Sequence, residues 1–519
     1  MKILILYPNL YGMNMLPPAV GIFTALLKRQ GHDVRLFDTT VYQGLYGSID
    51  SDKSKAENLN ARPYDDTILR RYAREGSAEA DFLKIVNDFK PELIAMSTTE
   101  DMYPIGANLL SILGEDKPFV VAGGVFPTFA PELTLGYSSG KIDAVLRGEG
   151  EETLPELVSL LEKGKDISRI QGLCLLKDGN FIQNRLPAPV NIDTDIVPDY
   201  SLFEESRFYR PMQGLMRRML PITTVRGCPY TCGYCNSPSQ KEAYRQSGHT
   251  FFRKKRIDLI HNELKYCLET YKADSFYFWA DTFLVWNDQE FDAFCEMYTE
   301  FKLPFWIQTR PETVTEHRLE RLKEVGLLRV AFGIEHGNEE FRREMLFRNV
   351  SNETILTNLK IVTDLGIPIS VNNILGFPKE TRELAFDTIE LNRGIHSDGI
   401  NAYAYTPFHG TPLRKLSEEL GYVEKGTLAR CINNSTMISM EHFPKYAIEG
   451  LRRCFVLYVK MPKSRWNNIG KAEALTPEGD KIWQELKEEC AQKYMHYNDR
   501  ESNNESIESK ITPNNHRGD

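Results

Sequence analysis

The chain has 519 residues, 41% of them hydrophobic and 26% charged, which is the balance of an ordinary soluble protein with two or three domains. A net charge of -9 and a pI of about 5.7 give no reason to expect nucleic acid as a partner, and no apolar stretch approaches the length of a membrane span. The nine cysteines are read as those of a protein from a reducing compartment, so we predict a cytoplasmic location.

Residues 1–155 alternate short apolar runs with stretches of helical periodicity. This alternation predicts βαβ units, and therefore a parallel sheet with helices on both faces. We expect a helix at 19–28 and strands at 2–7, 33–38, 93–97, 119–122 and 144–147.

Small and polar residues follow three of these strands. Ligands of such sheets bind at the carboxyl ends of the strands, where glycine lets the backbone approach a bulky molecule. The candidate ligand-binding residues are Ser97, Thr98, Gly123, Gly124, Val125, Thr128, Gly148 and Glu149. The glycine motifs that bind dinucleotides or nucleoside triphosphates are missing from this stretch, so neither ligand is expected.

Several motifs of this region occur in the order of a known domain. They are Leu16-Pro17-Pro18 with Gly21, Gly31-His32-Asp33-Val34, Gly123-Gly124 followed by Pro127-Thr128, and Arg147-Gly148-Glu149-Gly150-Glu151. With them the region resembles the flavodoxin-like domain that binds cobalamin, and the resemblance implies that the eight candidate residues bind this cofactor. The D-x-H-x-x-G motif is absent, which implies cobalamin without a protein histidine on cobalt. The alternative is a sheet whose glycines only make turns and which binds no ligand.

Two less regular segments follow. Residues 43–80 form a polar insertion that is long for a connecting loop, and such insertions serve as lids or as partner surfaces. Residues 156–215 are predicted to be a connector, with a short β piece near 172–176, a hairpin turn at 177–180 and several prolines.

Cys228, Cys232 and Cys235 form a C-x3-C-x2-C pattern directly after the strand-like run 221–225. Three thiolates on one loop can hold three irons of a four-iron, four-sulfur cluster and leave the fourth iron open to a small molecule. The alternatives are a zinc site, which would need a fourth ligand, and three buried structural thiols.

With Tyr234 just before the last cysteine, this loop resembles that of the radical S-adenosylmethionine (SAM) superfamily, many of whose members carry a cobalamin-binding domain ahead of the catalytic one. The resemblance implies that the open iron chelates SAM and that reductive cleavage yields a 5'-deoxyadenosyl radical. It also implies an electron donor such as flavodoxin or ferredoxin.

From 216 to 415 the chain again alternates strands and helices. Strands are expected at 221–225, 275–281, 305–310, 328–337, 369–375 and 400–405. These six βα units suit the partial (βα)6 barrel of radical SAM enzymes, with chemistry at the carboxyl ends of the strands. The short basic run 253–256 is read as a solvated helix start.

Polar residues at those strand ends are the candidate SAM-binding residues. By resemblance, Asp281 receives the methionyl amine, Glu335 contacts the ribose hydroxyls, and Tyr234 and Gly376 offer backbone near adenine. Arg310 could pair bidentately with a carboxylate. Alternatively, Arg310 and Glu335 pair with each other or cap a neighbouring helix. No residue is assigned a catalytic role.

Residues 416–497 are predicted to be helical and to close the barrel, and 498–519 to be a disordered tail. The predicted fold is therefore α/β: a flavodoxin-like cobalamin-binding domain, a partial (βα)6 barrel and a C-terminal helical region. The resemblance implies a cobalamin-dependent radical SAM enzyme that methylates an unactivated carbon of a small molecule. The alternatives are a cyclase or ring-rearrangement enzyme with the same cofactors, and a non-enzymatic cobalamin sensor. A methylthiotransferase of tRNA would carry a second cysteine cluster, and here no cysteine precedes Cys174.

Overall fold

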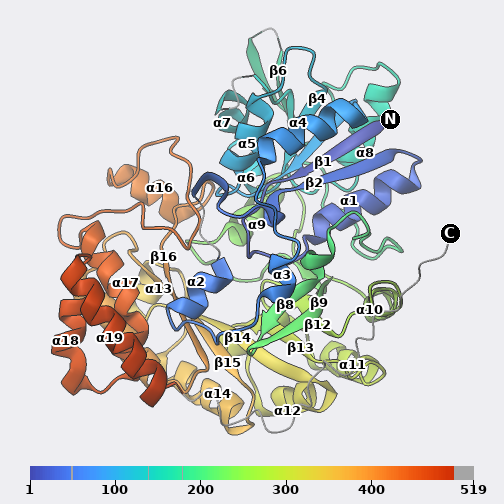
Figure 1. Ribbon diagram of the computed structural model, residues 1–519. Coiled ribbons are helices and arrows are strands. Elements are labelled where there is room, and N and C mark those ends of the chain that lie inside the picture. The colour runs from blue at the N-terminus through green and yellow to red at the C-terminus, as the bar shows by residue number, and fades with distance from the viewer. Residues whose placement is uncertain (48–50, 138–139, 178, 496–519) are drawn as a thin grey trace.

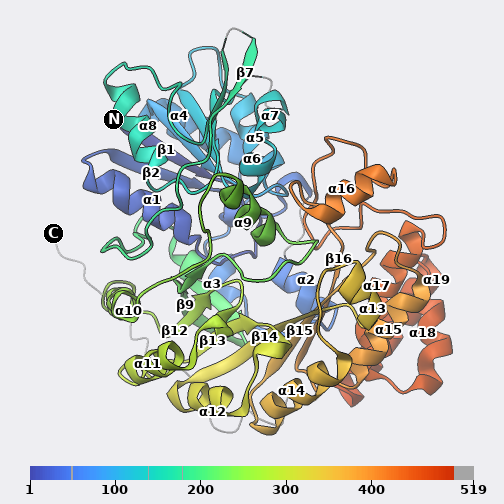
Figure 2. The same ribbon diagram turned by 180° about the vertical axis from the view of Figure 1, so that it is seen from behind.

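The computed structural model describes residues 1–47, 51–137, 140–177 and 179–495. Two sheets form separate lobes, with the N-terminal sheet above the second sheet in Figure 1 and the C-terminal helices beside the second sheet. Figure 2 shows the same two lobes from behind. The first sheet, the second sheet and the C-terminal helices thus occupy separate regions of the molecule.

The first sheet has the strand order β2-β1-β3-β4-β5-β6-β7. Its parallel strands are β1 (Lys2–Tyr7), β2 (Asp33–Asp38), β3 (Leu93–Ser97), β4 (Phe119–Gly123) and β5 (Ala144–Leu146). The order 2-1-3-4-5 is that of the flavodoxin-like fold, as predicted. The hairpin β6 (Leu173–Lys177) and β7 (Asn180–Gln183), which the sequence assigned to the connector, extends this sheet antiparallel beyond β5.

Helices cover both faces of this sheet because its strands are apolar on both sides. In β1, Ile3 and Ile5 pack into one core cluster and Leu4 and Leu6 into another. The first cluster takes in α1 (Pro18–Arg29) and α8 (Thr153–Glu162). The second takes in α4 (Ala78–Phe89), α5 (Tyr103–Ser111), α6 (Val125–Phe129) and α7 (Pro131–Tyr137).

The second sheet has the order β16-β15-β14-β13-β12-β9-β8. Its parallel strands are β9 (Leu215–Thr223), β12 (Ser275–Trp279), β13 (Phe305–Thr309), β14 (Leu327–Glu335), β15 (Ile369–Leu375) and β16 (Gly399–Ala404). These are the six predicted strands of the partial barrel. The seventh, β8 (Tyr209–Met212), pairs antiparallel with β9 at the edge.

Helices line the outside of this curled sheet. They are α10 (Ile257–Tyr271), α11 (Asp288–Tyr298), α12 (Glu316–Val325), α13 (Glu339–Glu344), α14 (Asn352–Asp364) and α15 (Arg382–Arg393). Alternate strand residues such as Phe276, Phe278 and Ile307 are buried beneath them, while Tyr277 and Trp306 stack with ring centroids 3.9 Å apart on the inner side.

The C-terminal region is helical, as expected, with α16 (Pro412–Glu419), α17 (Lys445–Lys460), α18 (Trp466–Ala472) and α19 (Pro477–Lys493). Figure 1 shows the orange and red helices beside the β16 edge of the barrel. The predicted disordered tail, 498–519, lies outside the described residues, which end at 495. Among the described helices, none is both long enough and apolar enough to cross a bilayer.

The insertion reaches from the first domain to the barrel. It contains α2 (Ser51–Glu57) and α3 (Thr67–Arg70), and α2 lies over the barrel strands in both views. Asn60 donates its side-chain amide to the Ile400 carbonyl at 2.6 Å and accepts the Ile400 amide at 3.2 Å. The insertion therefore acts as a bridge onto β16.

Candidate active site between the two sheets

A cavity of about 350 Å³ lies where the carboxyl ends of both sheets face each other. From the first domain it is lined by Ser97, Gly123, Gly124, Val125, Thr128, Gly148 and Glu149, and from the barrel by residues that include Thr223, Arg226, Trp279 and Asp281. The structure thus brings seven of the eight predicted cobalamin-binding residues to one cavity. Thr98 is buried behind it, and its hydroxyl donates to the Thr99 carbonyl at 2.8 Å.

The two glycines at the end of β4, Gly123 and Gly124, have different reasons to be glycine. A Cβ on Gly123 would meet only the Leu146 carbonyl oxygen, at 3.6 Å, so the position opens toward free space. Gly124 has φ +120°, and its Cβ would lie 2.2 Å from the Thr98 carbonyl oxygen. Gly123 therefore leaves room for a ligand, while Gly124 is required by the backbone itself.

Glu149 is occupied by protein partners. Its carboxylate accepts from Arg226 at 3.0 Å, from Arg253 at 2.6 Å and from the Val190 amide at 2.8 Å. Burial raises the pKa of this carboxyl, but the bonds from Arg253 and the charge of Arg226 outweigh it, so the net pKa is lowered. The prediction that Arg253 belongs to a solvated run is wrong, although α10 does begin at Ile257, directly after the run.

Cys228, Cys232 and Cys235 lie on the loop that joins β10 (Val225–Arg226) to α9 (Asn236–Gln246). Each sulfur has a polar neighbour: the Thr282 hydroxyl is 3.7 Å from Cys228 Sγ, Arg310 Nη1 is 3.1 Å from Cys232 Sγ, and the Ser237 amide is 3.4 Å from Cys235 Sγ. In the described chain, no group of three or more His, Cys, Asp or Glu side chains could hold one metal ion.

These thiols fit a cluster in which each thiolate binds its own iron. Donors at the sulfurs stabilise thiolate charge and tune such a cluster. Burial raises the pKa of the Cys228 thiol and raises that of Cys235 to about 12, so both thiols are protonated at neutral pH until metal displaces the proton.

Asp281 and Arg310 lie at the carboxyl ends of neighbouring strands. The Ser237 hydroxyl donates to Asp281 Oδ2 at 2.5 Å, and burial raises the pKa of this carboxyl although that bond lowers it. The Arg310 guanidinium pairs with Glu312 at 2.6 Å and stacks on Tyr230 at 3.6 Å. Arg310 therefore holds the cysteine loop, and its charge also lowers the pKa of Glu335.

Glu335 ends β14 with φ +68°, a left-handed conformation that is rare for a residue with a side chain. Arg348 Nη1 lies 3.3 Å from Glu335 Oε1 and 3.3 Å from the Tyr234 hydroxyl. Burial raises the pKa of Glu335, and Arg348 lowers it. Arg348, which sequence reasoning missed, thus joins two predicted SAM-binding residues, and no local motif marks it.

A buried carboxylate shapes the backbone at Gly376. Glu380 Oε2 accepts the amides of Gly376 at 2.5 Å and Phe377 at 2.9 Å, while its other oxygen lies 3.2 Å from His336 Nε2. Glu380 and His336 are fully buried. Neither was predicted, although an acid four residues after the turn glycine, in Gly376-Phe-Pro-Lys-Glu380, is a signal that could have found it.

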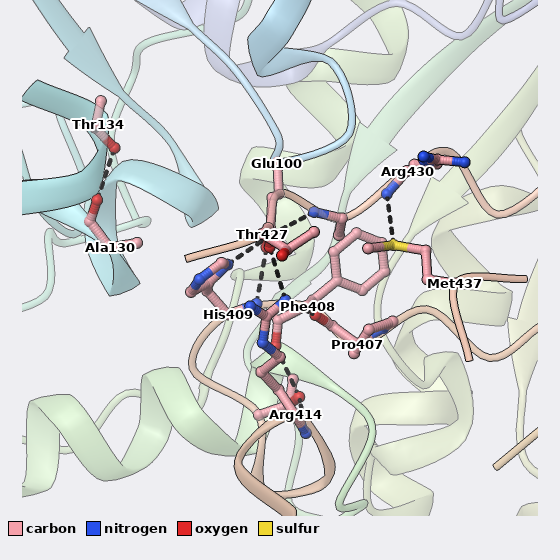
Figure 3. A network of polar contacts seen from close by, with 12 residues as sticks. Glu100, Ala130, Thr134, Pro407, Phe408, His409, Arg414, Thr427, Arg430 and Met437 are labelled. Atoms are coloured by element: carbon pink, nitrogen blue, oxygen red, sulfur yellow. Dashed lines mark hydrogen bonds and ion pairs between the residues drawn. The ribbon is translucent and has the colours of Figure 1, made fainter. Parts of the chain in front are cut away.

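A second buried acid holds the two lobes together (Figure 3). Glu100, 3% exposed and just beyond β3, accepts from the His409 amide at 2.8 Å, from His409 Nδ1 at 2.6 Å and from the Ala429 amide at 2.7 Å. Arg414 fixes the same loop by donating to the Pro407 and Thr427 carbonyls at 3.0 and 2.9 Å. The loop after β16 is thereby docked onto the first domain.

The donor set also fits cobalamin without a protein histidine on the metal. His32 is the one histidine of residues 1–155, and it lies 3.2 Å from the N-terminal amine at the start of β2, opposite the cavity. The open space at Gly123 is the cradle that a Cβ would fill.

Family comparisons agree with both parts. Residues 222–391 match the model of the Radical SAM superfamily, and residues 11–158 match that of the B12 binding domain. The chain is 28% identical over 395 residues to the uncharacterized methyltransferase PH0819 of Pyrococcus horikoshii, covering 74% of this chain and 82% of that one. It is 26% identical over 374 residues to the anaerobic magnesium-protoporphyrin IX monomethyl ester cyclase of Rubrivivax gelatinosus, covering 70% of this chain and 64% of the cyclase.

The fold is shared with the radical SAM methyltransferase TsrM of Kitasatospora setae, solved with cobalamin and a [4Fe-4S] cluster. The TM-score is 0.62 at 14% identity, over 94% of this chain and 99% of TsrM. The cofactors of the present chain are accordingly a four-iron cluster, SAM and cobalamin. The chain carries a B12 binding domain followed by a radical SAM domain, and it is a cobalamin-dependent radical SAM enzyme.

Proposed function

We propose that this enzyme methylates an unactivated carbon of a small-molecule substrate. The observation that carries the proposal is the shared cavity, since its walls come from β4 of the first domain and from the end of β12 in the barrel. When bound, cobalamin supplies a transferable methyl group, and the cluster with SAM supplies a radical that removes hydrogen from substrate. The protein's part is to hold these groups so that they meet at the cavity, which Asp281 and Gly123 both line.

In this proposal Cys228, Cys232 and Cys235 ligate the cluster. Asp281, Glu335 and the Gly376 backbone position SAM, and the side chain of Arg348 fixes Glu335. Gly123 and its neighbours would seat cobalamin, and Trp279, which is 38% exposed, lines the same cavity from the barrel side. An electron donor of the flavodoxin or ferredoxin class would reduce the cluster.

The test uses the reconstituted enzyme, a reductant and SAM labelled on its methyl group. Methyl transfer consumes two SAM per turnover and forms both S-adenosylhomocysteine and 5'-deoxyadenosine. Label in the product, with both by-products formed in step, would support the proposal.

A cyclase or ring-rearrangement enzyme is the second candidate, favoured by the similarity to the Rubrivivax cyclase. Such an enzyme has no methyl acceptor. An unlabelled product, with deoxyadenosine formed in step and little S-adenosylhomocysteine, would select it over the methyltransferase.

A further inference from the structure

A second cavity, of about 260 Å³, lies inside the curled barrel sheet near the amino ends of the strands. Its walls are inward-facing residues of β13 to β16 together with β8. The insertion closes it with Lys55, Asn60, Ala61, Arg62 and Tyr64. Arg62 of this segment lies 3.5 Å from Asp398, directly before β16. The insertion thus completes a chamber that the barrel alone would leave open.

Several basic side chains line the chamber. Of its lining residues, Lys55, Arg62, Arg210 and Arg329 carry positive charge, and Asp398 is the one acid among the lining residues that the structure describes. Asp398 is already engaged, because it accepts the Ile369 amide at 3.1 Å and pairs with Arg62. Asp398 therefore matches Arg62, and Arg210 and Arg329 are the two guanidinium groups that the barrel side contributes to the wall.

Of these residues, Arg329 gives the strongest indication that the chamber binds an anion. Its Nε is buried without a hydrogen-bond partner in the described part of the chain. Burial lowers the pKa of Arg329 to about 10, and Arg210 and Arg62 lower it as well, whereas Asp398 raises it. The guanidinium is still charged at neutral pH, and a buried charge of this kind is costly unless something pairs with it.

The other walls of the chamber suit a ligand that combines a charged group with an organic part. Arg210 lies over the ring of Trp306 at 5.5 Å, and Trp306 stacks on Tyr277. Gln308 donates its amide to the Ala280 carbonyl at 2.9 Å, so its oxygen is left for other donors. The cations thus lie beside an aromatic wall within the same barrel.

We propose that this chamber binds a phosphate group of the substrate, with Arg329 and Arg210 as its anchors. Arginine forks match phosphate oxygens bidentately, and a dianion offsets the two guanidinium charges of Arg329 and Arg210 better than a single carboxylate does. The inference rests on the proposed function, for which it names a substrate class. Arg329 precedes Glu335 by six residues on β14, about 20 Å along the strand, so the phosphate is many bonds from the reacting carbon.

The experiment measures binding without turnover. Full-length reconstituted enzyme is titrated calorimetrically with phenyl phosphate and with benzoate, which share a ring and differ in the anion. We expect phenyl phosphate to bind more tightly than benzoate. Arg329→Gln and Arg210→Gln should each weaken phenyl phosphate about tenfold or more, because each removes charge-assisted hydrogen bonds. Arg29→Gln, which removes an exposed charge 3.4 Å from Asp195, is the control and should change nothing.

Three results would overturn the proposal: no binding of phenyl phosphate at millimolar concentration, equal or tighter binding of benzoate, or binding that neither chamber variant weakens. Arg210→Gln keeps the test valid if Arg329→Gln fails to fold by circular dichroism. Formation of deoxyadenosine from SAM is measured in parallel. Enzyme that cleaves SAM but ignores phosphate refutes only this inference, whereas failure to cleave SAM refutes the proposed function.

Discussion

Arg226 pairs with Glu149 at 3.0 Å, and this contact joins the two halves of the active site. Arg226 stands two residues before Cys228, and Glu149 follows the last parallel strand of the first domain. Glu151 binds the same guanidinium at 2.6 Å. The acidic motif that the resemblance assigned to cobalamin therefore also positions the cysteine loop relative to the first sheet.

Glu149→Gln should destabilise the protein by about 3 kcal/mol, since Arg253 loses its carboxylate partner while Arg226 keeps only Glu151. The folded pKa of Glu149 is lowered, so its stabilisation is complete above its unfolded pKa of about 4.3 and is lost as pH falls through the folded value. Urea unfolding of cofactor-free protein should show a wild-type advantage at pH 7 that shrinks below about pH 4. The exposed Glu156→Gln is the control, and a pH-independent difference would contradict the assignment.

Gly123→Leu should abolish cobalamin binding while the protein stays folded, because its side chain would project into the cavity. Gly124→Leu should instead lower the melting temperature of the cofactor-free protein, because its Cβ would strike the Thr98 carbonyl oxygen. Absorbance of cobalamin retained after desalting, and thermal melting, separate the two effects. Wild-type retention by Gly123→Leu would show that the cofactor lies elsewhere.

Both sheets could be predicted from the sequence because each strand is a short apolar run that ends at glycine or acidic residues. Such a pattern can be read within a few neighbouring residues. It could not predict which charges meet across the fold. Glu100 contacts His409 from more than three hundred positions away, and Arg348 reaches both Tyr234 and Glu335. Arg253 looked solvated for the same reason, since its partner Glu149 lies in the other domain. Pairing between distant segments leaves no periodicity for a sequence pattern to reveal.

Replacing any one of Cys228, Cys232 or Cys235 by alanine should reduce bound iron and abolish SAM cleavage, because a cluster lacking a thiolate is poorly retained. Wild type should hold about four irons per chain after anaerobic reconstitution. Cys295→Ala, a buried thiol of α11, is the matched control and should keep its iron. Full SAM cleavage by any of the three variants would rule out the cluster assignment.

Glu380→Ala should weaken SAM binding about tenfold or more, because two backbone amides lose their acceptor and the turn at Gly376 is no longer held. Glu380→Gln keeps one oxygen for those amides. It loses the bond from His336 Nε2, because Nδ1 of that ring already accepts the Asn338 amide and Nε2 carries the proton. Glu380→Gln should therefore bind SAM more tightly than the alanine variant. Equilibrium dialysis of SAM against the reconstituted enzyme measures both.

Iron content and circular dichroism must match wild type for this comparison to count. Equal loss in both variants would mean that the negative charge matters rather than the shape of the turn. If folded Glu380→Ala binds SAM as tightly as wild type does, the orientation of the Gly376 amide does not affect SAM binding. Gly376 would then not belong to the SAM site.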